Sequence, residues 1–423
     1  MFQPNINIVI NSNKEIFIFK LSKDEDILYT IFDSSLNILK SEYLYTKNIL
    51  KYSTFIDENN IIHLIALINT GELNYYKYIN GEWSKAKIAK FNMKSNIYNQ
   101  VEILMIKNKL HILYNYSNLI NSNIWTIQHV IYGSEEKYNA IRYISNKTPD
   151  PFVVDVDSQG NIHLLYRSNM NTPQIYHSFY SPYTKSWSSL SKQISSDNYI
   201  NFPPFLFIDS QDNLHGLWLE KLDDKEQVKY LKMSSSGKEK YIWKDIKLPY
   251  TKLIKYTPII FEENNKLKLV FISEDNMELL YSLDHGNSWL IEKRNENLNE
   301  NIILAKIKSN INKINYIYCN PSDNIKLYFL DSFLYKEPQI ICKNSLSELE
   351  EKETPPESMK IKSDFTNELE DKFDNILDSY KYIESILSQI LYNQEDIQHK
   401  LDNIITQNSI DSTNTSFFRK LFK

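Results

Sequence analysis

Residues 156–166 read VDSQGNIHLLY, and residues 208–218 read IDSQDNLHGLW. Each stretch runs from an apolar strand residue through a polar turn into a second strand, so both predict the same hairpin. The pattern returns at residues 56–64, IDENNIIHL, and in weaker form at residues 105–114, MIKNKLHILY. Four copies at a regular spacing indicate an array of similar supersecondary units.

Three more segments align with the same hairpin pattern, and these are residues 13–18, 263–269 and 311–316. A second strand pair follows each hairpin, as where residues 73–78 lead through Asn80-Gly81, a tight-turn signal, to Trp83. Four short antiparallel strands every fifty or so residues are typical of a propeller blade. We predict an all-β, seven-bladed β-propeller over residues 1–342, with six or eight blades if an end copy is miscounted. A β-sandwich would not explain the period.

Composition limits the classes of function. Hydrophobic residues make up 42% of the 423 residues, enough for a sizeable core, and the net charge of -5 comes from interspersed charges that offer no basic field for nucleic acid. The start lacks a signal peptide, and no stretch is apolar enough to span a membrane. Cys319 and Cys342 are too few for a disulfide framework or a zinc site. We expect a cytoplasmic protein without a cofactor or nucleic-acid partner, with association with a spore or cell surface left open.

Four histidines occupy one position of successive repeats. Phe17, Lys268 and Asn315 take that position in the other three copies, so a ring of metal ligands around the axis would be broken. We interpret the histidines as structural groups that hold a turn or a neighbouring blade by hydrogen bonds. They are His63, His111, His163 and His215.

Residues 282–289 read SLDHGNSW. This octapeptide resembles the Asp-box, or bacterial neuraminidase repeat, of sialidases and of many non-enzymatic propellers. The resemblance implies a turn between two outer strands, in which Ser282 and Asp284 cap backbone amides and Trp289 packs between sheets. The residues that carry it are Ser282, Asp284, Gly286, Ser288 and Trp289, and Trp83, Trp187 and Trp243 stand at matching places.

The catalytic set that the sialidase resemblance implies is missing. It would need an arginine triad that grips a carboxylate and a pair of catalytic carboxyl groups. The chain has only Arg142, Arg167, Arg294 and Arg419, and no Arg-Ile-Pro segment near its start. We interpret Arg167 and Arg294 as surface or edge residues and predict a protein that is not an enzyme.

The residue composition changes after Cys342. Residues 343–363 are charged and interrupted by proline, which predicts a flexible linker. Residues 364–407 carry apolar side chains at alternating steps of four and three, which predicts a coiled coil that assembles a parallel trimer or tetramer. A helix docked on the propeller is the alternative. The seam residues are Leu369, Phe373, Ile376, Tyr380, Ile383, Leu387, Ile390, Gln394, Ile397, Leu401 and Ile404, with Gln394 fixing the register.

Residues 408–423 form a short basic and aromatic tail. Its end contains Phe417, Phe418, Arg419, Lys420 and Phe422. We interpret the tail either as a frayed end or as a weak anchor for a membrane surface or a protein groove, strengthened by presentation in several copies.

Three functions are compatible with this organisation. The first is a multivalent scaffold whose propeller heads bind protein partners on one face, and the second is a lectin-like carbohydrate-binding propeller. The unequal loops at residues 169–173 and 221–226 favour the first, because a glycan-binding propeller tends to repeat its pocket. A glycosidase is third, since its carboxylate pair is not found. The ligand and the face that binds it stay open.

Overall fold

The computed structural model describes residues 6–44, 47–146, 148–169, 172–223, 225–249, 256, 258–273, 276–297, 302–321 and 325–331. The chain divides into two units, Met1–Pro338 and Gln339–Lys423. The second unit lies outside the described residues. The predicted linker 343–363, the predicted helix 364–407 with its seam and the predicted tail 408–423 therefore remain predictions.

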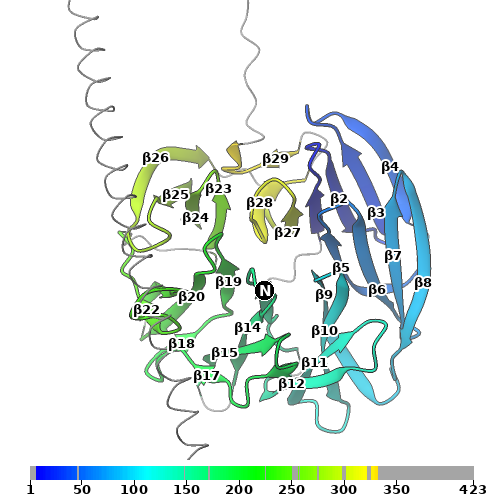
Figure 1. Ribbon diagram of the computed structural model, residues 1–423, viewed down its shortest axis with the longest axis horizontal. Helices are drawn as coiled ribbons and strands as arrows, with labels where there is room; N and C mark the ends of the chain where they lie inside the picture. Colours follow the sequence, from blue (N-terminus) through cyan, green and yellow to red (C-terminus); the bar gives the residue numbers. More distant parts are fainter. Residues whose placement is uncertain are drawn as a thin grey trace, which may run out of the picture. The chain divides into compact units, whose positions relative to one another are not determined.

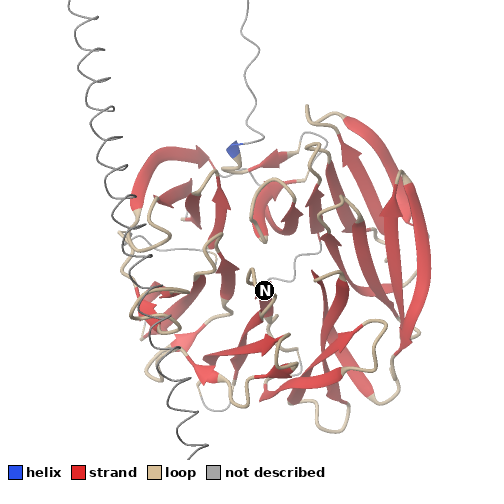
Figure 2. Cartoon of the chain, viewed as in Figure 1, coloured by secondary structure: helices blue, strands red, loops and turns tan. Residues whose placement is uncertain are grey.

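Strands and loops make up nearly all of the described residues (Figure 2). The largest sheet has the order β29-β28-β27-β1-β2-β3-β4, and its strands are β1 Ile6–Ile10, β2 Ile16–Leu21, β3 Ile27–Phe32, β4 Ile38–Leu44, β27 Ile303–Ser309, β28 Tyr316–Asn320 and β29 Lys326–Leu327. Two four-stranded sheets follow in sequence, with strands β5 Ile49–Ile56, β6 Ile62–Ile68, β7 Glu72–Ile79, β8 Glu82–Lys90, β9 Asn96–Ile106, β10 Lys109–Asn118, β11 Ile124–Ile131 and β12 Lys137–Ile144.

Two five-stranded sheets come next. The first contains β13 Val153–Val156, β14 Ile162–Ser168, β15 Gln174–Ser181, β16 Ser186–Trp187 and β17 Lys192–Gln193. The second contains β18 Ile200–Asn201, β19 Phe205–Ile208, β20 Leu214–Leu222, β21 Lys225–Met233 and β22 Trp243–Asp245. The remaining sheet contains β23 Ile259–Glu263, β24 Lys266–Ile272, β25 Asn276–Ser282 and β26 Leu290–Asn297. The sheets stand around a common centre (Figure 1), as in a propeller.

The two ends of the propeller body meet in one sheet. Strand β1 pairs in parallel with β27, in a register that sets Asn7 opposite Lys306 and Ile10 opposite Ser309. The other strand pairings described are antiparallel, as expected for hairpin-connected strands. The parallel pair therefore closes the ring of sheets with backbone hydrogen bonds, so that neither end leaves an open edge there.

The recurring hairpin turn is held by its aspartate. In three copies, the Asp carboxylate accepts hydrogen bonds of 2.8–3.0 Å from the backbone N–H groups two and four residues later. A residue with positive φ completes each turn, and these residues are Asn60, Gly160 and Asp212. The turn aspartates are Asp57, Asp157 and Asp209.

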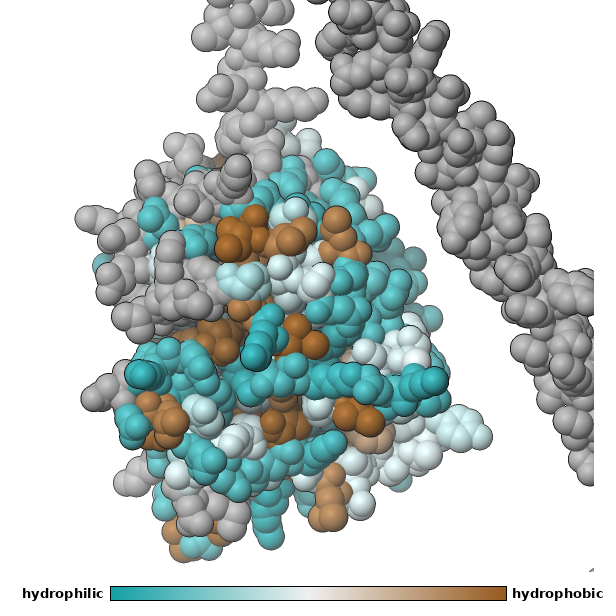
Figure 3. Space-filling view, turned by 90° about the vertical axis from the view of Figure 1, so that its left-hand side faces the viewer, coloured by the Kyte–Doolittle hydropathy of each residue, from teal (hydrophilic) through white to brown (hydrophobic). Residues whose placement is uncertain are grey.

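The core lies between sheets, because each sheet is covered on both faces by its neighbours. Strand β6 shows this, with six successive residues from Ile62 to Leu67 buried. Trp125 and Trp218 are 0% exposed and are among the largest buried side chains. The outer face shown in Figure 3 is mostly hydrophilic, with hydrophobic side chains in small separate groups. No helix in the described part of the chain has the length and apolar character of a membrane span.

Polar contacts also join neighbouring sheets at the hairpin turns. Ser158 donates its backbone N–H, at 2.8 Å, and its hydroxyl, at 2.5 Å, to the carboxylate of Asp212. Ser210 makes the same pair of bonds with Glu262, at 2.7 and 2.6 Å. A serine that follows the turn aspartate thus fixes the register of one sheet against the next.

Candidate functional site

The four repeat histidines lie on the second strand of four sheets, β6, β10, β14 and β20, and each bonds within its own sheet. Their Nδ1 atoms meet a third-strand partner at 2.6–3.1 Å, and the pairs are His63–Tyr75, His111–His129, His163–His177 and His215–Tyr230. Three of the Nε2 atoms face the turn aspartates Asp57, Asp157 and Asp209 at 3.2–3.5 Å. The described residues contain no group of three or more His, Cys, Asp or Glu side chains suited to a metal ion.

A tryptophan from the next sheet fixes the tautomers of one histidine pair. Trp243 donates its indole N–H to Nδ1 of His177 at 3.4 Å, and an indole can only donate. His177 must therefore donate from Nε2 to Nδ1 of His163, which in turn donates from Nε2 to Asp157. Trp187 holds His129 in the same way, at 3.2 Å.

Burial keeps the imidazoles of His177, His129 and His111 neutral. It lowers the pKa of His177 to about 3, and the neighbouring His163 and Lys192 act in the same direction. The pKa of His129 also falls to about 3 and that of His111 to about 4, again chiefly through burial. At neutral pH, these three imidazoles therefore make hydrogen bonds but carry no positive charge.

Residues 282–289 form a tight turn between β25 and β26. The carboxylate of Asp284 accepts bonds from the backbone N–H groups of Asn287 and Ser288, at 3.0 and 2.9 Å, and from the Ser288 hydroxyl at 2.6 Å. The Ser282 hydroxyl accepts the N–H of Gly286 at 2.8 Å. Trp289 is 5% exposed and packs edge-on against Tyr230 of the preceding sheet, with ring centroids 5.6 Å apart.

We expect Asp284→Ala to lower the free energy of unfolding by about 0.5–1.5 kcal/mol, because it removes the hydrogen bonds that hold this turn. Chemical denaturation measures the change. Asp33→Ala is a matched control in an exposed turn, where Asp33 also accepts two backbone N–H groups but no indole is held between sheets. A loss no larger than that of the control would contradict the role assigned to Asp284.

The tryptophans that match Trp289 make the same contact between sheets. Each ring packs on a third-strand aromatic or histidine of the preceding sheet, with centroids 5.3–5.8 Å apart. The pairs are Trp83–Tyr29, Trp187–His129, Trp243–His177 and Trp289–Tyr230. The Trp is thus a repeated element of the contact between sheets.

A wide groove opens between the sheet of β13–β17 and the sheet of β18–β22, with a volume of about 670 Å³. It is called the inter-sheet groove below. It combines aromatic and apolar side chains with hydroxyl, amide, carboxylate and imidazole groups. The lining residues are Asp157, Gln159, Asn161, His163, His177, Phe179, Ser181, Ser188, Leu190, Lys192, Asp212, Leu214, Met233, Ser234, Ser235, Tyr241 and Trp243.

The turn at residues 282–289 fills the corresponding space at the next sheet boundary. His285 reaches the carboxylate of Asp209 at 3.3 Å, and Gly286 lies so close to Tyr230 that a methyl group there would collide with its hydroxyl. Asp209 and His215 consequently have side chains that are 0% exposed.

A longer turn leaves the inter-sheet groove open. Residues 234–242 separate β21 from β22, whereas residues 283–289 separate β25 from β26. Trp243 keeps its place over His177, but Tyr241 is 62% exposed. The side chains of Asp157 and His163 are correspondingly 12% and 9% exposed, so they border the groove.

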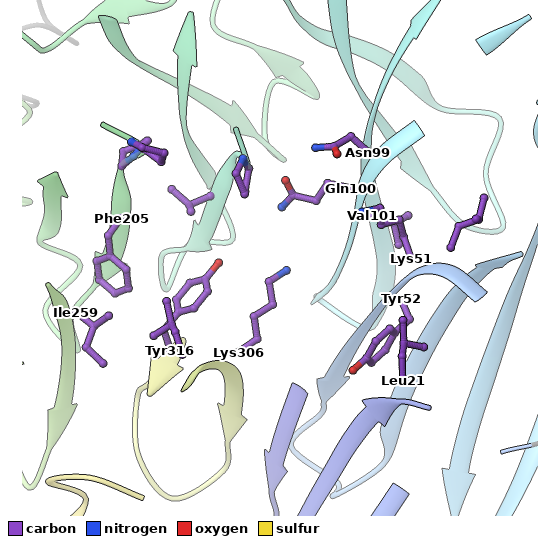
Figure 4. A pocket seen from close by; sticks show the side chains of 16 residues that line it. Leu21, Lys51, Tyr52, Asn99, Gln100, Val101, Phe205, Ile259, Lys306 and Tyr316 are labelled. Atoms are coloured by element: carbon purple, nitrogen blue, oxygen red, sulfur yellow. The ribbon is translucent and has the colours of Figure 1, made fainter. Parts of the chain in front are cut away.

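A second, smaller pocket of about 120 Å³ lies at the mouth of the central channel (Figure 4) and is called the channel-mouth pocket below. The inner strands of several sheets supply its walls. Its lining residues are Leu21, Leu50, Lys51, Tyr52, Asn99, Gln100, Val101, Pro151, Val153, Pro203, Pro204, Phe205, Ile259, Leu304, Lys306 and Tyr316.

Arg167 lies inside β14 and is not the surface or edge residue that the sequence suggested. It forms an ion pair with Asp150, with Nε 2.6 Å from the carboxylate, and its Nη1 donates to the carbonyl of Asn201 at 2.8 Å. Its side chain is only 15% exposed. The sequence-based interpretation was wrong because Asp150 comes from the loop before β13, and nothing local to Arg167 indicates that partner. The side chain of Arg294 lies outside the described residues.

Comparison with known proteins supports the fold. No protein-family model matches the sequence, and no curated protein sequence matches it either. Among solved structures, an ulvan lyase of polysaccharide lyase family PL25 is similar at TM-score 0.51 and 11% identity, covering 77% of this chain and 91% of its own. The BP39L lectin of Burkholderia pseudomallei is similar at TM-score 0.51 and 11% identity, covering 72% and 88%.

A third solved structure, the Aleuria aurantia lectin described as a six-bladed β-propeller, has TM-score 0.41 and 13% identity and covers 69% of this chain and 95% of its own. At 11% identity, the first two structures establish similarity of fold alone. The chain is therefore an all-β protein of propeller type, and its ligand has to be argued from its own residues.

Proposed function

We propose that this protein binds carbohydrate through the inter-sheet groove and does not catalyse a reaction. The observation that carries the proposal is the groove itself, where exposed aromatic faces stand beside a ring of hydrogen-bonding groups. Tyr241 is 62% exposed and Phe179 is 42% exposed, and both line the groove. A sugar presents apolar C–H faces and peripheral hydroxyl groups, so it fits a wall of this mixed kind.

The polar side of the groove is held in place before any ligand arrives. Asp157 and Asn161 belong to the capped hairpin turn, and Asp212 is fixed by Ser158 across the sheet boundary. Ser188 exchanges a hydrogen bond with Ser178 at 2.8 Å. Groups with fixed positions bind at a lower entropic cost than mobile ones, which favours recognition of a polar ligand.

Two of the similar structures support this choice over the scaffold function. One is named a lectin and the other a polysaccharide lyase, so both are carbohydrate-directed proteins. The sequence favoured protein partners only because the loops at residues 169–173 and 221–226 differ from each other. Unequal loops are equally compatible with a single groove, as the long turn at residues 234–242 illustrates, and the scaffold function stays the second candidate.

We propose further that the propeller has seven blades and that several chains assemble, so that one assembly presents several grooves. The three strands β27–β29 count as the seventh blade, because residues of β27 line the same central pocket as residues of β5 and β9. The helix predicted over residues 364–407 would gather three or four heads. Weak binding to single sugars would then add up to strong binding to a glycan-bearing surface.

A glycan-array screen of the full chain beside a truncation after residue 342 tests this function. We expect the full chain to bind a small set of glycans selectively. The truncated protein should bind the same glycans, but more weakly. No binding by a folded full-length chain would reject carbohydrate recognition and return the scaffold function to first place.

We expect Tyr241→Ala to weaken binding of the best glycan by about 2- to 13-fold, because an aromatic contact contributes about 0.5–1.5 kcal/mol. Isothermal titration calorimetry measures the affinity. Tyr183→Ala is the matched control, since Tyr183 is 95% exposed in the β15–β16 turn and is not among the lining residues of the groove. Equal affinities for the two variants would exclude Tyr241 from the binding site.

A further inference from the structure

The turn between β27 and β28 closes the central channel at one end. Asn310 donates from Nδ2 to the carbonyl of Asp57 at 2.8 Å, directly after β5. Lys313 donates to the carbonyl of Asp209 at 2.9 Å, directly after β19. The channel-mouth pocket takes its lining residues mostly from the first halves of the inner strands β5, β13, β19 and β23. The pocket therefore lies at the opposite end of the channel, and the turn closes the channel behind it.

Most of the pocket wall is hydrocarbon. The apolar side chains include Leu21, Val101, Val153, Phe205, Ile259 and Leu304. The pocket volume of about 120 Å³ is close to that of an apolar cavity of about 150 Å³ that holds benzene. A ligand of this pocket should therefore have an apolar body about the size of one six-membered ring.

The amide and charged groups of the wall are already bound within the protein. Gln100 donates from Nε2 to Glu102 at 2.5 Å and to the carbonyl of Phe152 at 2.8 Å, and its Oε1 accepts the N–H of Phe152 at 3.0 Å. Lys306 forms an ion pair with Glu102. Partners are also present for Lys51, Tyr52 and Asn99. An ionic ligand would have to break one of these contacts to be neutralised, so the pocket favours an uncharged ligand.

The hydroxyl group of Tyr316 is directed toward the middle of the opening (Figure 4). Among the described residues it has no hydrogen-bond partner, and the ring is held by an edge-on contact with Phe205 at a centroid distance of 5.5 Å. Burial raises the pKa of Tyr316, and the carboxylates of Glu102 and Asp155 raise it further, so the hydroxyl keeps its proton. A ligand that supplies an acceptor would satisfy this donor.

We propose that the channel-mouth pocket binds a small uncharged one-ring compound that carries a single hydrogen-bond-accepting oxygen. The ring lies against the apolar wall, and the oxygen accepts a hydrogen bond from Tyr316. The pocket is too small for an oligosaccharide. It shares no lining residue with the inter-sheet groove, so this site is independent of the proposed carbohydrate binding.

Calorimetric titration of the full chain with cyclohexanone tests the ligand class, with the cyclohexylammonium ion as the charged compound of the same shape. We expect cyclohexanone to bind at least tenfold more tightly than the cation, because the wall offers the cation no free countercharge. No binding of cyclohexanone, or equal binding of the two compounds, would overturn the proposal.

The variant Tyr316→Phe tests the hydrogen bond. It should weaken cyclohexanone binding by about 2- to 13-fold, the effect of one hydrogen bond, and leave the binding of toluene unchanged, because toluene has no oxygen. The variant should fold normally, since the hydroxyl holds no other described residue. Tyr183→Phe is the matched control at a tyrosine that is 95% exposed, and it should change neither affinity. Equal cyclohexanone affinities in the two variants would overturn the role of Tyr316.

A second variant locates the site without changing a polar group. Leu21→Trp adds bulk to the pocket wall and should weaken the binding of both cyclohexanone and toluene at least tenfold. Unchanged affinities would place the two compounds elsewhere and overturn the proposal. Glycan binding by the same variants reports separately on the inter-sheet groove.

Discussion

Replacing Lys268 by methionine is expected to lower the free energy of unfolding by about 3–5 kcal/mol. Lys268 is 1% exposed, and its ammonium group lies 2.6 Å from Glu263 Oε2, 2.5 Å from Asp331 Oδ2 and 2.8 Å from the carbonyl of Phe329. Methionine would leave the carboxylate of Glu263, whose side chain is 0% exposed, buried without its countercharge. It would also remove the bonds that Lys268 makes to the carbonyl of Phe329 and to Asp331.

Urea denaturation of the full chain measures this effect. Lys87→Met is the control, because the Lys87–Glu72 pair is half-exposed and such a pair contributes about 0–1 kcal/mol. The double variant Lys268→Met/Glu263→Gln should recover part of the loss, since it removes the buried charge as well. A loss for Lys268→Met as small as that of the control would contradict the account of this cluster.

Stability is expected to fall steeply between pH 6.5 and pH 4, because three buried histidines resist protonation. The pKa is about 3 for His177 and His129 and about 4 for His111, against 6.5 in the unfolded chain. Above pH 6.5 both states are neutral. Below it, the unfolded chain binds protons that the folded chain does not, so the folded state loses stability as the pH falls. At pH 4.5, His177 alone costs about 2–3 kcal/mol.

Denaturation curves collected between pH 7.5 and pH 4 measure this dependence. The variant His177→Gln removes one titrating group, so its stability should depend less on pH, by up to about 1.4 kcal/mol per pH unit in this range. Only the slopes are compared, whatever the stability of the variant at pH 7. Parallel slopes for the variant and the natural protein would show that His177 does not remain neutral in the folded state.

The repeat was the part of the fold that the sequence could predict. The hairpin with its aspartate is local, so residues 156–166 and 208–218 revealed both the turn and the strands on either side of it. The parallel pairing of β1 with β27 could not be foreseen, because its partners lie about 300 residues apart and carry no local signal. The position of one sheet against the next also depends on single contacts between distant residues, such as Ser158 with Asp212, and the sequence carries no local signal for them.

Only part of the candidate site could be predicted from the sequence. The sequence singled out the repeat histidines and the tryptophans, and two of them, His163 and Trp243, do meet at the inter-sheet groove, where both contact His177, which the sequence did not single out. The groove itself arises from a difference between repeats, namely the longer turn before Trp243. Phe179 and Tyr241 are unremarkable in the sequence, and only the packing of two sheets brings them together.

Carbohydrate recognition as proposed requires a sugar in the inter-sheet groove. A crystal structure of the full chain soaked with the best ligand from the glycan array tests this requirement. We expect a sugar ring in the groove, packed on Tyr241 and hydrogen-bonded near Asp157 and Asn161. A sugar bound at any other place on the propeller, with the groove holding only solvent, would contradict it.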